Sequence, residues 1–302
     1  MTNSLILPAL IGSHPLGAMS SFGLLRLISS VDPLAKLAFV LRDDWVACIE
    51  SSIYTNEGLL IQALERWLNS DDLDQALTWA SDVRVQPAVY RAALKDGGGA
   101  KTTRSDFLCS LVADGALDTQ KGLVKPSAFY MVSGQQSFLG GMREILAQTR
   151  RSAGAIFREA VFGPWRYQVR SHSLGWDPNT ERLYALRSRA PSSEKPSCVA
   201  GAMLLAFWAL PMMPALSHEG RPQTIGFSRR GREQSFRWPI FSKSIDASEL
   251  TTLLQVGSKG WRGPQGMRSG IETVFESSRF EFGQGYAVLR PAQSIHARSL
   301  IG

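Results

Sequence analysis

The hydrophobic pattern of the first 125 residues is mainly that of amphipathic helices. In the segment 16–30, Leu16, Met19, Leu24 and Leu27 recur at helical spacing, with small residues between them. The same spacing predicts three later helices, at 57–68, 69–83 and 105–117. The glycine run at 97–99 predicts a flexible joint before the last of these.

Beyond residue 125 the pattern alternates between strand-like and helical segments. The predicted helices are a long one at 135–161 and an apolar one at 199–210. The predicted strands are 126–133, 165–174, 182–188, 224–228, 235–241 and 284–290. The sequence therefore predicts an α+β protein in two parts. A mainly helical domain, residues 1–125, is followed by a domain of mixed antiparallel sheet and helix, residues 126–302.

Charge divides unevenly between these two parts. Residues 1–125 hold 11 Lys+Arg and 14 Asp+Glu, a net of −3, whereas residues 126–302 hold 22 Lys+Arg and 12 Asp+Glu, a net of +10. Of the 22 basic residues in the second part, 19 are arginines. The planar guanidinium matches phosphates and base edges and stacks on aromatic rings, so this bias favours a nucleic-acid partner. A membrane surface explains it less well, because the arginines are spread over many segments rather than along one amphipathic helix.

The segment "FSRRGREQSFRWPIF", residues 227–241, combines arginines with aromatic residues. We predict that Arg229, Arg230 and Arg232 form a phosphate-contacting loop, in which Gly231 lets the backbone turn sharply. The aromatic residues of the following "FRW" are expected to anchor the next strand in the core.

Two further segments place arginines on a shared face. Arg143, Arg150 and Arg158 are spaced seven or eight residues apart on the predicted 135–161 helix. In "GPWRYQVR" (163–170), strand alternation sets the arginines opposite the aromatic residues, which predicts a sheet with one basic face. The candidate nucleic-acid-binding residues are Arg143, Arg150, Arg151, Arg158, Arg166, Arg170, Arg229, Arg230, Arg232, Lys243, Lys259, Arg262 and Arg268.

Sequence motifs for catalysis or metal binding are missing. The segment "DGGGAKTT" (96–103) lacks the glycine that precedes the lysine of a P-loop, and "DDLD" (71–74) is typical of a helix start. The four histidines stand apart from one another and from the cysteines, so no metal site is predicted. Without paired carboxylates or a nucleophile motif, we expect no enzymatic activity and no cofactor.

The cellular location is predicted from the lack of a membrane span, a signal peptide and a disulfide pattern in the sequence. The longest apolar run, 198–216, is interrupted by Pro211 and Pro214, so no membrane span is expected. The N-terminus lacks the pattern of a secretory signal peptide. Three cysteines, far apart and odd in number, predict no disulfide framework. A cytoplasmic location fits these features.

Six segments, in order along nearly the whole chain, resemble one family. They are "LPALIGSHPLGAMSSFGLLRLISSVDP" (7–33), "FYMVSGQQSFLGGMREIL" (129–146), "SLGWDPNTERLYAL" (173–186), "AMLLAFWALPMMP" (202–214), "FRWPIF" (236–241) and "GYAVLRPA" (285–292). Together they resemble the small large-subunit proteins of type I-G (formerly I-U) CRISPR surveillance complexes.

This resemblance implies a non-enzymatic subunit of an RNA-guided complex that binds double-stranded target DNA. Such a subunit sits at the 5′ end of the crRNA, among the backbone and guide-end subunits. It helps to recognise the protospacer-adjacent motif, supports strand separation and presents the target to a separate helicase-nuclease.

Two other functions stay open at this point. One is a nucleic-acid-processing enzyme such as a nuclease, and the other is a structural adaptor whose basic face docks an acidic protein. The small residues of the 16–28 helix are similarly ambiguous. They either pack within this protein's own core or receive a neighbouring subunit.

Overall fold

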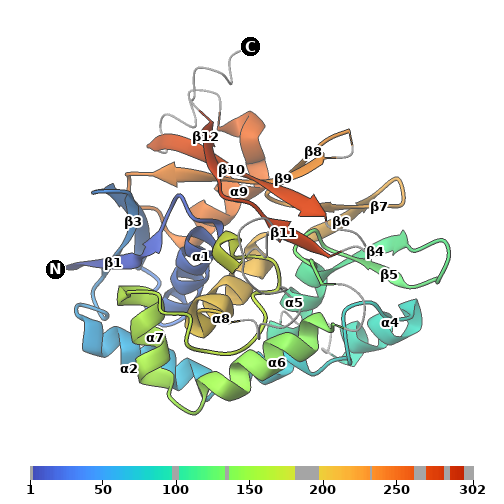
Figure 1. Cartoon of the computed structure of the whole chain (residues 1–302), viewed down its shortest axis with the longest axis horizontal. Coiled ribbons are helices and arrows are strands. Elements are labelled where there is room, and N and C mark those ends of the chain that lie inside the picture. The colour runs from blue at the N-terminus through green and yellow to red at the C-terminus, as the bar shows by residue number, and fades with distance from the viewer. Residues whose placement is uncertain are drawn as a thin grey trace, which may run out of the picture.

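The structure, a computed structural model, describes residues 3–96, 102–132, 136–180, 197–231, 233–261, 270–281 and 286–295. The helices are α1 (Pro15–Ser29), α2 (Glu57–Leu68), α3 (Asp72–Leu77), α4 (Pro87–Asp96), α5 (Thr103–Leu111), α6 (Phe138–Thr149), α7 (Ala153–Phe162), α8 (Ala200–Ala209) and α9 (Ala247–Gly260). The strands are β1 (Asn3–Ile11), β2 (Lys36–Leu41), β3 (Trp45–Ser51), β4 (Val112–Leu117), β5 (Val124–Pro126), β6 (Ala215–His218), β7 (Arg221–Thr224), β8 (Phe227–Arg230), β9 (Glu233–Phe241), β10 (Ile271–Glu281), β11 (Ala287–Leu289) and β12 (Gln293–Ile295). Helices and antiparallel sheets together confirm the α+β fold class (Figure 1).

Two buried helices, α1 and α8, lie side by side at the centre of the molecule (Figure 1). Every residue of α8 is buried, as its uninterrupted apolar sequence requires. The Ser20 hydroxyl of α1 donates a hydrogen bond of 2.8 Å to the carbonyl oxygen of Ala202. A Cβ atom at Gly23 would overlap the carbonyl oxygen of Leu205. The small residues of α1 therefore serve close packing inside this protein, which was the first of their two interpretations.

The N-terminal part is less helical than the sequence predicts. Strands β1, β3 and β2 form an antiparallel sheet in that order, and β4 pairs with β5. The helix expected at 105–117 ends at Leu111, and its second half is strand β4. The prediction of a mainly helical first part is thus only roughly correct, because it missed these strands.

The C-terminal sheet has the order β11–β10–β9–β8, and β12 also pairs with β10. All of its pairings are antiparallel. The sheet lies over the two central helices, and α2, α6 and α7 form a helical layer on the opposite side (Figure 1). The indole of Trp238 on β9 donates a 2.7 Å hydrogen bond to the carbonyl oxygen of Gly12, which ties this sheet to the turn before α1.

One hydrophobic core contains residues from both sides of position 125. Phe39 of β2 packs edge-to-face on Phe241 of β9, and Phe107 of α5 stacks on Phe207 of α8 at a centroid distance of 4.5 Å. The predicted boundary therefore separates two stretches of sequence that share a core.

Several predicted elements of the second part differ in detail. The helix expected at 135–161 is two helices, α6 and α7, interrupted at 150–152. Within the strand expected at 126–133, residues 127–132 are irregular backbone, although Phe129 and Met131 are fully buried there. The stretch 165–174 forms only one bridge, between Val169 and Cys198, while 182–188 lies outside the described residues.

Within these described ranges, no helix has both the length and the apolar character needed to cross a membrane.

Candidate nucleic-acid interface

The hairpin of β8 and β9 presents the arginines of the 227–241 segment at its end. Arg230 is opposite Glu233 in the register, and Gly231 follows with a φ of +60° in the turn. Arg229 and Arg230 are exposed, and the Nε of Arg229 donates to the carbonyl oxygen of Gly231 at 3.1 Å. No described atom lies within 4 Å of where a Cβ of Gly231 would be. The backbone of this turn is therefore open to approach by a ligand.

Aromatic residues anchor this hairpin, as the sequence predicts. Phe236 and Trp238 of β9 are fully buried. Phe227 of β8 packs against Phe129 and Phe236, at centroid distances of 4.9 and 5.5 Å. The apolar face of the hairpin is thus fixed to the core, and the alternate residues face outward.

The outward residues of β8, β9 and β10 form two cross-strand rows. Ser228, Ser235 and Ser278 are paired across the three strands, and Arg290, just after β11, donates its backbone N–H to the carbonyl oxygen of Ser278. The second row consists of Arg237 on β9, Glu276 on β10 and Gln293 on β12.

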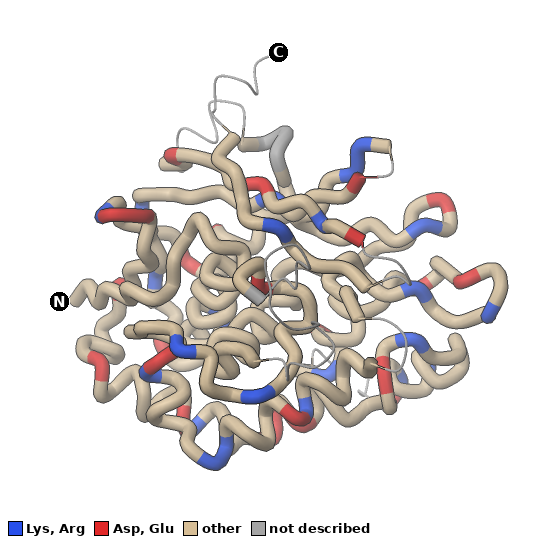
Figure 2. The backbone as a smooth tube through the Cα atoms, in the orientation of Figure 1, with Lys and Arg blue, Asp and Glu red and all other residues tan. Residues whose placement is uncertain are grey.

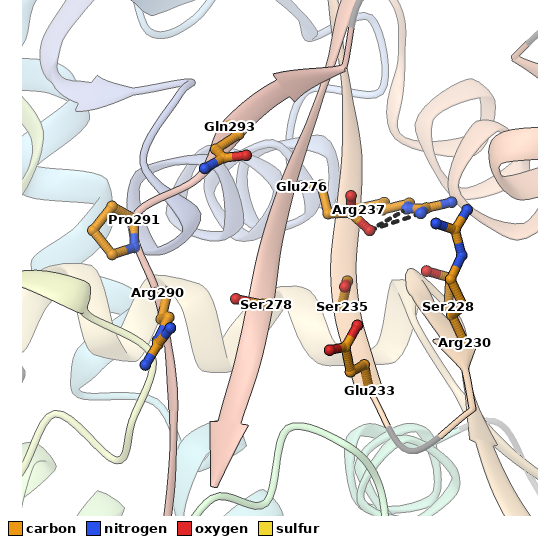
Figure 3. A pocket seen from close by; sticks show the side chains of 10 residues that line it. All are labelled: Ser228, Arg230, Glu233, Ser235, Arg237, Glu276, Ser278, Arg290, Pro291 and Gln293. Atoms are coloured by element: carbon orange, nitrogen blue, oxygen red, sulfur yellow. Dashed lines mark hydrogen bonds and ion pairs between the residues drawn. The ribbon is translucent and has the colours of Figure 1, made fainter. Parts of the chain in front are cut away.

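A hollow of about 490 Å³ lies over these rows (Figure 3). The hollow forms where the short serine side chains leave space between the longer side chains of arginine and glutamate. It is lined by Ser228, Arg230, Glu233, Ser235, Arg237, Glu276, Ser278, Arg290, Pro291 and Gln293. Three arginines and two glutamates give this lining a net charge of +1. We call it the outer-sheet hollow.

The three arginines of the outer-sheet hollow differ in their contacts. Arg237 is held by Glu276, whose Oε1 accepts from both Nε and Nη2 at 2.7 Å (Figure 3). The guanidinium of Arg290 lies 3.8 Å from the ring centroid of Phe280, a cation–π contact with an exposed aromatic ring. Among the described residues, no carboxylate pairs with Arg230 or Arg290. These two cations remain available to an anion.

Three of the four arginines in the predicted 135–161 helix make their contacts within the protein. Arg143 donates to the carbonyl oxygens of Leu77, Ala80 and Ser81 at 2.7, 3.2 and 2.9 Å. Arg150 pairs with Asp74 at 2.6 Å and Arg158 pairs with Glu57, so both face the acidic N-terminal part. We therefore leave these three out of the interface.

The remaining candidates do not form one surface with the hairpin. Arg151 precedes α7, Arg166 and Arg170 follow it, and all three are exposed. Helix α7 belongs to the lower helical layer, whereas β8 lies at the upper edge of the molecule (Figure 1). Along 165–170 the arginines do alternate with half-buried Trp165 and Tyr167, although the backbone is not a strand. Basic residues are spread over much of the surface, and the end of β8 is one of several such places (Figure 2).

Five candidates are left, of which the structure describes the side chain of one. Lys243, just after β9, is exposed. Arg232, Arg262 and Arg268 lie outside the described residues, as does the side chain of Lys259.

One histidine has a polar environment that the sequence does not reveal. The backbone N–H of Gly17 donates to Nδ1 of His14 at 3.4 Å, and the Nε2 lies 3.4 Å from the carboxylate of Asp177, whose side chain is fully buried. Both ring nitrogens face structural partners, and the ring edge meets Trp165. We assign His14 to capping α1.

Over the part of the chain that the structure describes, no three His, Cys, Asp or Glu residues are grouped to hold a metal ion. No family model matches this chain, and no curated protein matches its sequence.

The sequence pattern did not indicate Arg290, Glu276 or the serine row, and Arg237 is not among the predicted binding residues. The alternation in "EQSFRWPIF" contains a signal for the outer face, since Ser235 and Arg237 alternate with the buried aromatics. The pairing of β9 with β10 cannot be predicted from the sequence of either strand alone.

Proposed function

We propose that this chain is a non-catalytic nucleic-acid-binding subunit of a cytoplasmic, RNA-guided CRISPR effector complex. In this role it contacts double-stranded target DNA and helps to recognise the protospacer-adjacent motif. It also supports strand separation and presents the target to a separate helicase-nuclease. The observation that carries the nucleic-acid part is the β8–β9 hairpin, whose exposed arginines project from an anchored base.

The hairpin suits a phosphate backbone for two physical reasons. Arg229 and Arg230 place two exposed positive charges at the end of the hairpin, against the one carboxylate of Glu233 on the facing strand. Gly231 adds an open backbone that a phosphate can approach closely. The buried aromatics hold the strands, so little ordering entropy is lost when the DNA binds.

The CRISPR assignment rests on the ordered segments that resemble the family. In this fold these segments pack on one another. The indole of Trp176 donates to the carbonyl oxygen of Phe129 at 2.9 Å, and Ala287 N–H donates to the carbonyl oxygen of Met131 at 3.0 Å. These four residues are fully buried, so the segments that resemble the family include residues of this chain's own core.

The nucleic-acid part is tested by the salt dependence of binding. Binding of the full chain to a labelled 30-bp duplex is measured between 50 and 200 mM salt, with Arg229→Ala/Arg230→Ala as the test variant. The slope of log K against log salt should fall by roughly 0.9 for each phosphate that the variant no longer neutralises. The matched control is Arg150→Ala/Arg158→Ala, which removes the same charge from internal pairs and should leave the slope unchanged.

An unchanged slope in the hairpin variant would remove this hairpin from the interface and favour an adaptor that docks an acidic protein. Assembly is tested separately by co-purification from the native host. A tagged chain should bring down a short guide RNA together with backbone subunits, and recovery of the chain alone would refute the CRISPR assignment.

A further inference from the structure

The residues that line the outer-sheet hollow are poorly suited to binding the phosphate backbone of a duplex. Glu233 and Glu276 stand in it, and carboxylates repel phosphates. Carboxylate and hydroxyl oxygens do accept hydrogen bonds from the amino and ring N–H groups of bases. A net charge of +1 is enough for one phosphate and too small for a continuous phosphate track.

The hollow also has a planar cationic wall. The guanidinium of Arg290 lies over the ring of Phe280, so the aromatic ring holds it in place. A base stacks on such a plane only when it is exposed, which requires an unpaired strand. Phe280 itself is 36% exposed and extends the wall beyond the hollow.

The size agrees with a few nucleotides. The four strands from β8 to β11 span about 14 Å at the usual strand spacing. The volume of about 490 Å³ lies within the range of small-molecule sites. Bases inside a duplex are stacked and paired, so only a single strand could place them here.

We infer that the outer-sheet hollow binds one or two unpaired nucleotides of a single strand. Arg230 holds a phosphate, Arg290 on Phe280 stacks a base, and Glu276 with the serine row meets the base edge. The inference rests on the proposed nucleic-acid function and adds a site for single strands next to the hairpin end, with which it shares Arg230.

The test compares single strands with a duplex. The full chain is titrated with a labelled 10-nucleotide DNA, the RNA of the same sequence, and a 20-bp duplex. Arg290→Ala removes the stacking plane, Arg290→Lys keeps the charge but not the plane, and Ser278→Phe fills the hollow from an exposed position. The control, Arg91→Ala, removes one exposed charge from α4.

All three hollow variants should weaken single-strand binding about tenfold and change duplex binding less than twofold. Arg91→Ala should change neither, and melting temperatures should match the parent chain. Equal losses for duplex and single strand, or full binding by the Ser278→Phe variant, would overturn the inference while leaving the proposed function intact. A parent chain that binds none of the three probes would refute both. Tighter binding of the DNA probe would identify the strand as displaced target DNA, and tighter binding of the RNA probe would identify it as guide RNA.

Discussion

The hydroxyl of Ser20 donates a 2.8 Å hydrogen bond to the carbonyl oxygen of Ala202, which lies 182 positions later in the chain. The same hydroxyl also donates to Leu16 within its own helix. Helices α1 and α8 thus approach so closely that a side-chain hydroxyl of one reaches the backbone of the other. This contact accounts for the small residues of α1 and allows sharp predictions about them.

Gly23→Ala should destabilise the protein. The new methyl group would overlap the carbonyl oxygen of Leu205, and forcing the helices apart costs about 1–3 kcal/mol of unfolding free energy. Gly58→Ala on α2 is the matched control, because a Cβ there would make one ordinary contact, 3.4 Å from Oδ1 of Asn56. That control should be neutral or slightly stabilising. Urea denaturation measures the unfolding free energy of both variants. Equal stability of the two would contradict close packing of α1 on α8.

Arg143→Ala should lower stability without affecting nucleic-acid binding. The substitution leaves three carbonyl oxygens, those of Leu77, Ala80 and Ser81, without their charged donor, at a cost of about 1.5–3 kcal/mol. Arg151→Ala, an exposed neighbour, should stay within about 0.5 kcal/mol of the parent. Chemical denaturation and duplex titration are the measurements. A stable Arg143→Ala variant with weakened DNA binding would return this residue to the interface.

Asp32→Asn should destabilise the protein in a pH-dependent way. Burial acts to raise the pKa of Asp32, but hydrogen bonds from Ser51, Ser52 and Leu34 outweigh it and hold the pKa below its ordinary value of 3.8. A lowered pKa means that the carboxylate stabilises the fold above that value, and that this contribution disappears as the pH falls through the native pKa.

At pH 7 the loss should be about 1.5–3 kcal/mol, since the amide nitrogen of Asn cannot accept the hydrogen bonds that the carboxylate accepts. The difference between Asp32→Asn and the parent should shrink below about pH 4. Denaturation curves at pH 7 and pH 3 measure it. A constant difference would show that the carboxylate charge is not responsible.

Cysteine reactivity should follow exposure. Cys109 is exposed, whereas Cys48 and Cys198 are buried. Burial raises the pKa of the Cys48 and Cys198 thiols, that of Cys198 to about 12. The thiol of Cys109 is only partly desolvated, and this desolvation together with the charges of Asp106 and Asp114 raises its pKa as well. In the folded protein, one thiol per chain should therefore react with a thiol reagent, slowly at pH 7 and faster toward pH 9. The rate rises with pH because the thiolate is the reactive form. Cys109→Ser should abolish this phase, and the other two thiols should react only in denaturant. Fast reaction of Cys198 in the native state would contradict the buried position.

The sequence predicts the amphipathic elements best. Helix α2 has the predicted bounds, since its apolar stripe is regular and Asn56 caps its start by accepting from the N–H of Leu59. Strand β3, "WVACIES", is buried along most of its length. A strand with both faces covered shows no alternation of apolar and polar residues, which is why β3 was not predicted.

The candidate site was only partly predictable. The hairpin arginines follow from a local segment, but Arg237 and Glu276 are 39 positions apart and meet through strand register alone. Charge asymmetry was also ambiguous. Arg150 and Arg158 of the basic part neutralise Asp74 and Glu57 of the acidic part, so part of the imbalance is complementarity within one molecule.

The contact between α1 and α8 also sets the order in which a nascent chain folds. Helix α1 is almost entirely buried, yet its partner begins at Ala200. At synthesis rates of about 5–20 residues per second, α1 waits roughly 10 to 35 s for α8 to be made. During that interval an apolar helix is exposed without its partner, so newly made chains should depend on chaperones that shield apolar segments until α8 leaves the ribosome.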